Sequence, residues 1–199
     1  MPQRGETSEE SSLSKLKSLC VYCGSREGDR PVFVETARAL GVACAENGTE
    51  LVYGGGALGL MGETARAARD AGGHVFGVIP QFLVDVEGIA EGIDHEIVPD
   101  MHTRKMMMFE RAEAFCTLPG GIGTLEEVIE LLSWARLDLH RKPVVICDVE
   151  GFWSPLVELL NHVIDRGFAA KELRDDIVVV QRAEDVIPAA EDRIMRTKL

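Results

Sequence analysis

A glycine-rich turn, Pro119-Gly120-Gly121-Ile122-Gly123-Thr124, leads into an amphipathic stretch. Glycines let backbone N–H groups converge, and the macrodipole of a following helix adds partial positive charge at its first turn. These properties predict a binding site for a phosphate group. No Gly-Lys-Ser/Thr follows the glycines, so the turn is not a Walker A loop, which disfavours an ATPase or a kinase.

Two acidic residues, Glu126 and Glu127, follow this turn directly. Thr124 and Glu127 have the spacing of a capping box, in which side chains satisfy free amides at a helix start, and spacing alone favours that structural role. Both acids lie off the predicted core stripe of the helix, so they can also face a pocket shared with the phosphate site. The stripe consists of Leu125, Val128, Ile129 and Leu132.

The segment 101–108 forms a local basic cluster in an otherwise acidic chain. Arg104 and Arg111 are seven residues apart, which places them on one face of a helix. An arginine fork binds phosphate or carboxylate, so the pair predicts an anion clamp. A solvated face, with the neighbouring methionines filling gaps in the core, explains the cluster equally well.

A second glycine turn, Gly54–Gly59, has the G-x-G-x-x-G spacing of a dinucleotide-binding loop. That fingerprint also needs an acid at the end of the next strand for the ribose hydroxyls. Here the next predicted strand ends in Pro80-Gln81, which disfavours an NAD-linked oxidoreductase. We expect the turn to combine close helix packing with backbone amides that face a ligand.

Other candidate residues are weaker. Cys23 follows a predicted strand and is a possible nucleophile, but no base stands near it, and a buried thiol in the core is commoner. His102 is a possible acid or base, although a capping or packing role is favoured. His140 and Asp148 lack the spacing to another His or Cys that a metal site needs.

The composition argues against several classes of function. Among 199 residues, 33 are acidic and 21 basic, and the net charge of −12 disfavours binding to nucleic acid or to anionic membranes. No run of 18 apolar residues predicts a membrane-spanning helix. The odd count of five cysteines, three of them in apolar runs, favours a cytoplasmic protein with reduced thiols. The polar segment Met1–Ser14 predicts a disordered extension rather than a signal peptide.

Apolar runs alternate with amphipathic stretches over residues 15–199, which predicts one α/β domain with a Rossmann-like, doubly wound parallel sheet. Ligands of such folds bind beyond the carboxyl ends of the strands, where the strand order reverses. The irregular stretch Pro80–Asp100 predicts a lid or binding loop. The predicted strands are Leu16–Tyr22, Glu50–Tyr53, His74–Ile79, Ala114–Leu118, Pro143–Cys147 and Ile177–Val180. The predicted helices are Val32–Glu46, Leu60–Ala71, His102–Ala112, Thr124–Leu137, Trp153–Asp165 and Ala183–Met195.

Together these segments resemble the LONELY GUY (LOG) family of cytokinin riboside 5′-monophosphate phosphoribohydrolases, a group also labelled lysine decarboxylase-like. The resemblance runs from about Lys17 to the C-terminal helix. It is carried by Val21–Ser25, Tyr53–Gly62, Met101–Lys105 and Pro119–Glu127, of which the last two are highly specific as a pair. Decarboxylation would use a lysine Schiff base with pyridoxal phosphate, and no distinct lysine offers itself.

The resemblance implies hydrolysis of the N-glycosidic bond of AMP-type nucleoside 5′-monophosphates, without cofactor or metal. It places the catalytic pair at Arg104 and Glu127. Cleavage builds positive charge on the ribose ring, which a carboxylate such as Glu127 can stabilise, while Arg104 binds phosphate or orients that carboxylate. The implied substrate contacts are Gly24, Ser25, Gly55, Glu87, Arg104, Lys105, Gly120, Gly121, Ile122, Gly123, Thr124, Leu125, Glu126 and Ser133.

The main alternative is a non-catalytic nucleotide-binding or carrier protein on the same fold, because a fold alone does not specify chemistry. The resemblance and the frequency of two-fold dimers favour a homodimer. A bulky apolar surface formed by Trp134, Leu137 and Leu139 is expected to serve a partner helix, with Arg111 or Trp134 able to act across the interface. The sequence leaves open whether the base is adenine or a prenylated adenine.

Overall fold

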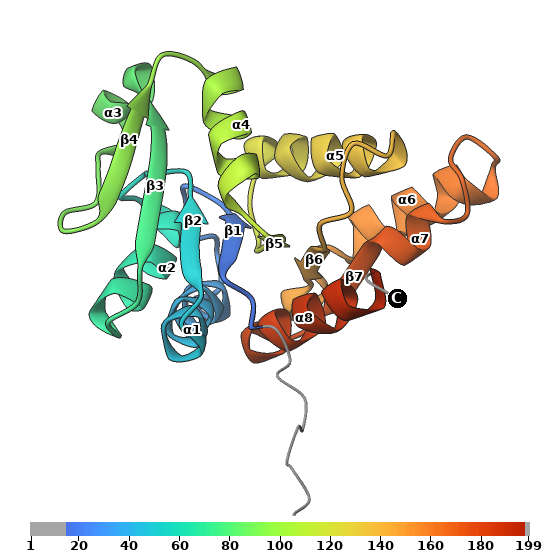
Figure 1. Cartoon of the computed structure of the whole chain (residues 1–199), viewed down its shortest axis with the longest axis horizontal. Helices are drawn as coiled ribbons and strands as arrows, with labels where there is room; N and C mark the ends of the chain where they lie inside the picture. The colour runs from blue at the N-terminus through green and yellow to red at the C-terminus, as the bar shows by residue number, and fades with distance from the viewer. Residues whose placement is uncertain (1–14, 198–199) are drawn as a thin grey trace, which may run out of the picture.

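A seven-stranded parallel sheet forms the centre of the structure, a computed structural model that describes residues 15–197 (Figure 1). The predicted extension Met1–Ser14 lies outside the described residues. The predicted Rossmann-like α/β fold in a single domain is confirmed. The strands are β1 (Ser18–Tyr22), β2 (Glu50–Tyr53), β3 (Val75–Pro80), β4 (Asp94–Val98), β5 (Ala114–Thr117), β6 (Val144–Cys147) and β7 (Ile177–Val180).

Helices cover both faces of the sheet, as its uniformly apolar inner strands require. One core cluster packs α1, α2 and α8 against the sheet, and a second packs α4, α5, α6 and α7 against the opposite face. The helices are α1 (Pro31–Asn47), α2 (Gly59–Asp70), α3 (Gln81–Glu87), α4 (Met101–Arg111), α5 (Ile122–Arg136), α6 (Ser154–Asp165), α7 (Leu173–Asp176) and α8 (Val186–Thr197), with short 3₁₀ turns at Val149–Gly151 and Ala183–Asp185.

The strand order β4-β3-β2-β1-β5-β6-β7 reverses direction between β1 and β5. These two strands lie side by side, with Tyr22 paired to Thr117 at their carboxyl ends. The loops that follow β1 and β5 therefore start next to each other, and the loop after β2 lies one strand away. This is the switch point at which open α/β sheets bind their ligands.

The stretch Pro80–Asp100, from which the sequence predicts an irregular lid or binding loop, is largely regular in structure. It contains α3 and the edge strand β4, which pairs with β3. Four of the five β4 residues are exposed, and no residue of α3 is buried. Neither element therefore carries the apolar pattern by which buried strands and helices are found from sequence.

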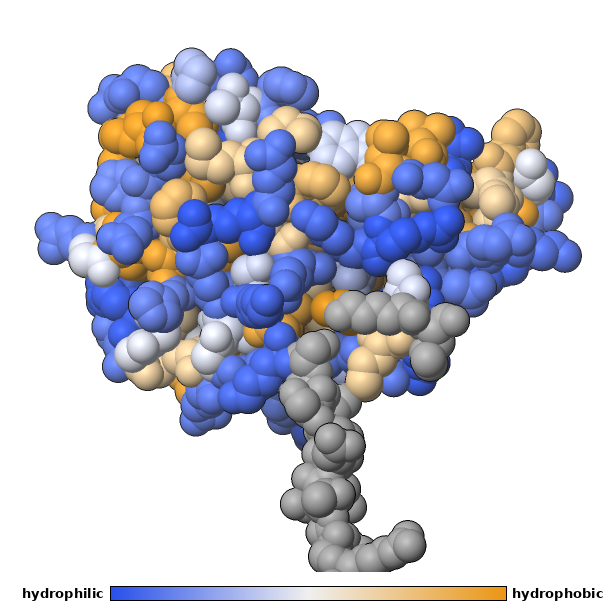
Figure 2. Space-filling view, in the orientation of Figure 1, coloured by the Kyte–Doolittle hydropathy of each residue, from blue (hydrophilic) through white to orange (hydrophobic). Residues whose placement is uncertain are grey.

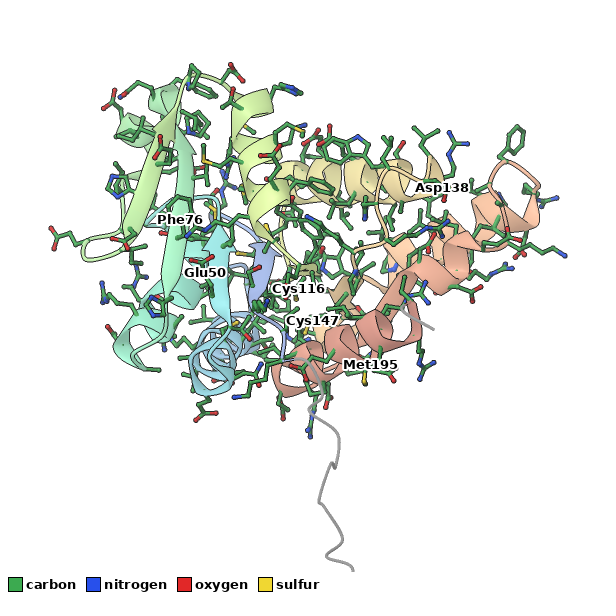
Figure 3. All side chains as sticks on the ribbon, in the orientation of Figure 1. Glu50, Phe76, Cys116, Asp138, Cys147 and Met195 are labelled. Carbon is green, nitrogen blue, oxygen red and sulfur yellow. The ribbon has the colours of Figure 1, made fainter. Side chains whose placement is uncertain are left out.

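The interior holds all five cysteines as free, buried thiols. Figure 3 shows Cys116 and Cys147 side by side in the centre of the molecule, on β5 and β6. Between residues 15 and 197, no helix combines the length and apolar character needed to cross a membrane.

Candidate functional site

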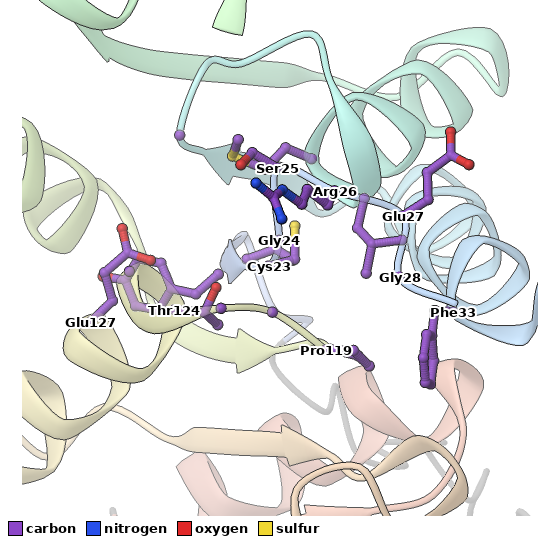
Figure 4. Close-up of a pocket in the computed structure, with 18 of the residues that line it drawn as sticks. Cys23, Gly24, Ser25, Arg26, Glu27, Gly28, Phe33, Pro119, Thr124 and Glu127 are labelled. Carbon is purple, nitrogen blue, oxygen red and sulfur yellow. The ribbon is translucent and has the colours of Figure 1, made fainter. Parts of the chain in front are cut away.

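A cavity of about 530 Å³ opens at the carboxyl edge of the sheet, beside the loops after β1, β2 and β5. Its position at the switch point confirms the prediction from the fold class. Figure 4 shows Thr124 and Glu127 of α5 on one side of the cavity, and the loop after β1 on the other. The cavity therefore joins the glycine-rich turn Gly120–Thr124, Arg104 and Glu127, which lie on separate elements.

Arg104 reaches the cavity from the first turn of α4 and is buried there. Its Nε donates to the carbonyl oxygen of Val78 at 3.2 Å, and one Nη donates to that of Gly54 at 3.2 Å. Val78 lies in β3, and Gly54 directly follows β2. A β-carbon on Gly54 would stand 1.9 Å from the guanidinium, so glycine there makes room for it. The sheet thus fixes a positive charge at the cavity wall, and no carboxylate among residues 15–197 forms an ion pair with it.

Glu127 lies in the second turn of α5 and is only 9% exposed. Among residues 15–197, no side chain or backbone group forms a hydrogen bond or ion pair with its carboxyl group within the usual distances. Burial raises the pKa of Glu127 to about 7, while Arg104 and Lys105 lower it and the nearby Glu126 and Glu87 raise it. The group is therefore poised to exchange a proton near neutral pH.

The capping-box interpretation of Thr124 and Glu127 is wrong. Helix α5 begins at Ile122, two residues earlier than predicted, and its N-cap is Gly121. Thr124 therefore lies inside the first turn, and no side chain caps the helix start. Glu127 is left free to face the cavity.

The N-terminus of α5 is built to receive an anion. The first helical hydrogen bond runs from the N–H of Leu125 to the carbonyl of Gly121, so the preceding amides are unused by the helix. A β-carbon on Gly121 or Gly123 would meet open space, and both glycines line the cavity. Gly120 instead packs on Thr124 and fixes the turn.

Comparison with known proteins identifies the group to which this chain is related. The family model described as "Possible lysine decarboxylase" matches residues 61–190. Cytokinin riboside 5'-monophosphate phosphoribohydrolase LOG7 of Arabidopsis thaliana is 41% identical over 184 residues, covering 92% of this chain and 85% of that protein. The protein LOG of Oryza sativa subsp. japonica, which has the same enzyme name, is 40% identical over 182 residues, covering 91% and 75%. The chain belongs to the LOG family.

Solved structures support the fold assignment of this LOG-family chain. A molybdenum cofactor binding protein from Rippkaea orientalis aligns with a TM-score of 0.67 at 20% identity, covering 91% of this chain and 99% of that one. The Moco carrier protein of Chlamydomonas reinhardtii aligns with a TM-score of 0.68 at 22% identity, covering 92% and 99%. At these identities the likeness shows a shared fold.

The description of the family model names a lysine decarboxylase, and that chemistry would use a lysine to hold pyridoxal phosphate. None of the described lysines lines the cavity of this LOG-family chain. The lining therefore offers no lysine to hold that cofactor. Nor do the described residues contain a group of three or more His, Cys, Asp or Glu side chains suited to a metal ion.

Glu87, expected as a substrate contact of LOG-family proteins, ends α3 and lines the cavity. One of its carboxyl oxygens is buried and has no hydrogen-bond partner among residues 15–197. Burial raises the pKa of Glu87, and Arg104 opposes that rise. Its backbone carbonyl accepts from the N–H of Ala57 at 3.1 Å, which ties α3 to the glycine turn after β2.

The structure brings most of the expected substrate contacts to the cavity but leaves five outside it. Lys105, Glu126 and Ser133 lie outside its lining, and Lys105 is engaged by acids of α5. Gly55 turns against Ile79 of β3 with a φ of +79°, so its role in the protein is close packing. The residues found on the wall are Gly24, Ser25, Glu87, Arg104, Gly120, Gly121, Ile122, Gly123, Thr124 and Glu127, and those outside are Gly55, Lys105, Leu125, Glu126 and Ser133.

The prediction of an anion clamp formed by Arg104 and Arg111 is wrong. Helix α4 runs from the carboxyl ends of the strands to their amino ends, so its two arginines lie at opposite ends of the strands. Arg111 donates twice to the carboxylate of Glu50, at 2.8 and 2.7 Å, and lies 3.7 Å from the ring centre of Phe76. Figure 3 marks Glu50 and Phe76, which lie on β2 and β3. Arg111 therefore has a structural role at the amino ends of the strands, away from the cavity.

The structure does not support a catalytic role for the weaker candidates. Cys23 lines the cavity, but burial raises the pKa of its thiol well above the usual range, so it is no ready nucleophile. His102 is exposed outside the cavity, and Asp100 caps α4 in its place, accepting from the N–H of Thr103 at 2.8 Å. Asp148 accepts from two amides at the start of α6, at 2.6 and 3.1 Å. His140 is buried with both ring nitrogens in contact with backbone groups.

The cavity also has an aromatic part that sequence reasoning missed. Phe33 of α1 and Phe152 line it and meet edge to face, with ring centres 5.5 Å apart. Phe152 follows the carboxyl end of β6, and this position after a strand could have marked it as a cavity residue from the sequence. Phe33 lies inside an apolar helix pattern, so the sequence carried no signal that its side chain lines the cavity.

Proposed function

We propose that this chain hydrolyses the N-glycosidic bond of AMP-type nucleoside 5′-monophosphates and releases the free base and ribose 5-phosphate. The observation that carries the proposal is that Glu127, buried and without a hydrogen-bond partner among residues 15–197, lines the same cavity as Arg104 and the open N-terminus of α5. Its LOG-family relatives, which are named cytokinin riboside 5'-monophosphate phosphoribohydrolases, support the same activity.

The phosphate binds at the N-terminus of α5. Its charge interacts with the unused amides and the helix dipole, and Gly121 and Gly123 allow close approach. Anchoring the phosphate fixes the ribose relative to Glu127, so binding energy from a group remote from the reacting bond supports catalysis.

The ionised carboxylate of Glu127 acts at the anomeric carbon. As the bond to the base lengthens, positive charge grows on the ribose ring, and the carboxylate stabilises it and accepts a proton from the attacking water. The oxygen of that water bonds to the anomeric carbon, and the base leaves with the electrons of the broken bond. The base takes up a proton from solvent, and Glu127 returns to solvent the proton that it accepted from the water. The charge of Arg104 lowers the pKa of Glu127 and so favours its ionised form. Arg104 does not protonate the leaving base, because a guanidinium keeps its proton.

The test is incubation of the purified chain with AMP and with isopentenyl-AMP, followed by measurement of free base and ribose 5-phosphate. We expect equal amounts of both products, and the ratio of the two rates identifies the preferred base. Binding of nucleotide without cleavage would instead support the carrier function that the fold also permits.

We also propose that two copies of the chain associate through the end of α5. Leu137 and Leu139 are 54% and 64% exposed, and Figure 2 shows apolar surface over this end of the helix. Trp134, expected on the same surface, packs edge to face on Phe109 at 5.2 Å, so the two leucines carry the proposal. The five free thiols favour a reducing compartment such as the cytoplasm.

A further inference from the structure

The cavity continues beyond the N-terminus of α5, on the side away from Glu127. Figure 4 shows Glu127 on one side of the cavity, Phe33 on the opposite side, and Thr124, in the first turn of α5, between them. A phosphate that binds at this helix start, with its ribose beside Glu127, is joined to the ribose on the Glu127 side. Any further group on the same phosphate would therefore extend toward Phe33, into a part of the cavity that we call the far end. The far end is lined by Arg26, Glu27, Gly28, Asp29, Phe33 and Phe152.

Two phenylalanines form the apolar wall of the far end. Phe33 and Phe152 meet edge to face, with ring centres 5.5 Å apart. Phe33 is only 6% exposed, and Gly28 packs so closely on its ring that an added β-carbon would stand 2.7 Å from it. Phe152 is 38% exposed, so its ring presents most of the aromatic surface that an incoming group would meet.

The chain around Phe152 is held on both sides. Glu150, two residues earlier, has a φ of +50°, a left-handed conformation that is unfavourable for a residue other than glycine. Its carboxylate pairs with Arg30 at 2.5 Å, which links this turn to the loop before α1. Trp153, the next residue, donates its N–H to Asp148 at 2.6 Å. Strained backbone persists where the surrounding structure imposes it, often at functional sites, so we expect Phe152 to keep its place when a ligand binds.

The charged residues of the far end suit one phosphate group. Arg26 forms no ion pair among residues 15–197, so its guanidinium is available for a phosphate beside the N-terminus of α5. Arg30 is already paired with Glu150 and lies outside the cavity lining. The carboxylates of Glu27 and Asp29 oppose any further negative charge. In the described lining of the far end, a second phosphate would therefore find two acids and an apolar ring but no further cation to bind it.

We propose that Phe152 is a specificity-determining residue, which limits the substrate to one phosphate group and excludes nucleoside 5′-diphosphates and triphosphates. A phosphate charge that moves from water against an apolar ring loses hydrogen bonds and gains none in return. Discrimination of this kind comes from an unfavourable contact with the wrong ligand and needs no added contact with the right one. The proposal rests on the proposed function and deepens it, because it names the residue that sets how many phosphates are accepted.

The test compares AMP and ADP as substrates of the wild-type chain, Phe152→Leu and Phe152→Arg in magnesium-free buffer. Leucine keeps the wall apolar, whereas arginine places a cation where the second phosphate would lie. The matched control is Phe168→Arg, which adds the same charge at an exposed position outside the cavity lining. We expect kcat/KM to favour AMP over ADP at least about 100-fold in the wild-type chain and in Phe152→Leu. In Phe152→Arg this preference should fall roughly ten-fold, mainly through a lower KM for ADP, and Phe168→Arg should leave it unchanged.

Two results would overturn this role of Phe152. One is cleavage of ADP by the wild-type chain with a kcat/KM close to that for AMP, and the other is the same preference in Phe152→Arg as in Phe168→Arg. Calorimetric affinities for AMP and ADP make the test independent of turnover. If the wild-type chain binds AMP but cleaves neither nucleotide, the proposed function fails, while the ratio of the two affinities still tests Phe152 in the same four proteins. If AMP does not bind at all, both proposals fail.

Discussion

At the scale of single residues, the site depends on a carboxyl group kept in an unfavourable environment. Glu127 is buried without a hydrogen-bond partner among residues 15–197, and its pKa of about 7 reflects that burial. Burying an unpaired carboxylate lowers stability, and such groups persist where function needs them. Arg104 offsets part of this cost and is itself held by backbone carbonyls.

We therefore expect Glu127→Gln to stabilise the protein in alkaline solution. The folded chain holds a proton on Glu127 up to about pH 7, whereas the unfolded chain loses it near the ordinary value of 4.5. Wild-type stability thus falls as the pH rises from 4.5 to 7, and glutamine removes this loss. The gain should be absent at pH 4 and reach on the order of 3 kcal/mol at pH 8 in urea-unfolding measurements. Equal stability of the two proteins at pH 8 would show that Glu127 is not desolvated.

At the scale of elements, the important feature is the uncapped start of α5. Its early beginning at Ile122 leaves the first-turn amides free, and two glycines clear the space in front of them. The spacing of Thr124 and Glu127 pointed to a capping box, because sequence shows the spacing but not the residue at which a helix begins. The helix and the glycine-rich turn before it were predictable from the sequence, whereas the free position of Glu127 depends on the residue at which the helix begins.

A negative charge placed at this helix start should exclude the substrate. We predict that Gly123→Asp raises the KM for AMP on the order of 1,000-fold, because like charges about 4 Å apart repel by about 4 kcal/mol near a protein surface. Gly123→Asn has nearly the same shape without the charge and serves as the control. Similar KM values for the two variants would place the phosphate elsewhere.

At the scale of the whole molecule, the sheet brings together residues that are far apart in sequence. The six strands with apolar runs were predictable, and so was a site at their carboxyl edge. The polar edge strand β4 and the exposed helix α3 were not, because neither is buried enough to leave a pattern. The sequence did not show that Arg104 and Arg111 lie at opposite ends of the strands. Their spacing indicates a shared helix face, but it does not show how the helix runs along the sheet.

At this scale we also predict that two copies of the chain associate through the end of α5. Leu137→Glu combined with Leu139→Glu should convert a dimer to a monomer in sedimentation equilibrium, because each substitution would bury an unpaired charge in the interface. Leu159→Glu combined with Phe168→Glu, on exposed positions near α6, is the control. A wild-type chain that sediments as a monomer would contradict this assignment.

The most direct test of the central claim is the single-turnover rate of AMP cleavage by Glu127→Gln beside the wild-type chain, with AMP affinity measured on the same samples. The control is Glu110→Gln, an exposed acid of α4 outside the cavity. We predict that Glu127→Gln binds AMP with affinity close to wild type but cleaves it at least 10²- to 10³-fold more slowly, roughly the loss seen when one stabilising group is removed from a transition state. Cleavage by Glu127→Gln at a rate close to that of wild type would contradict the account.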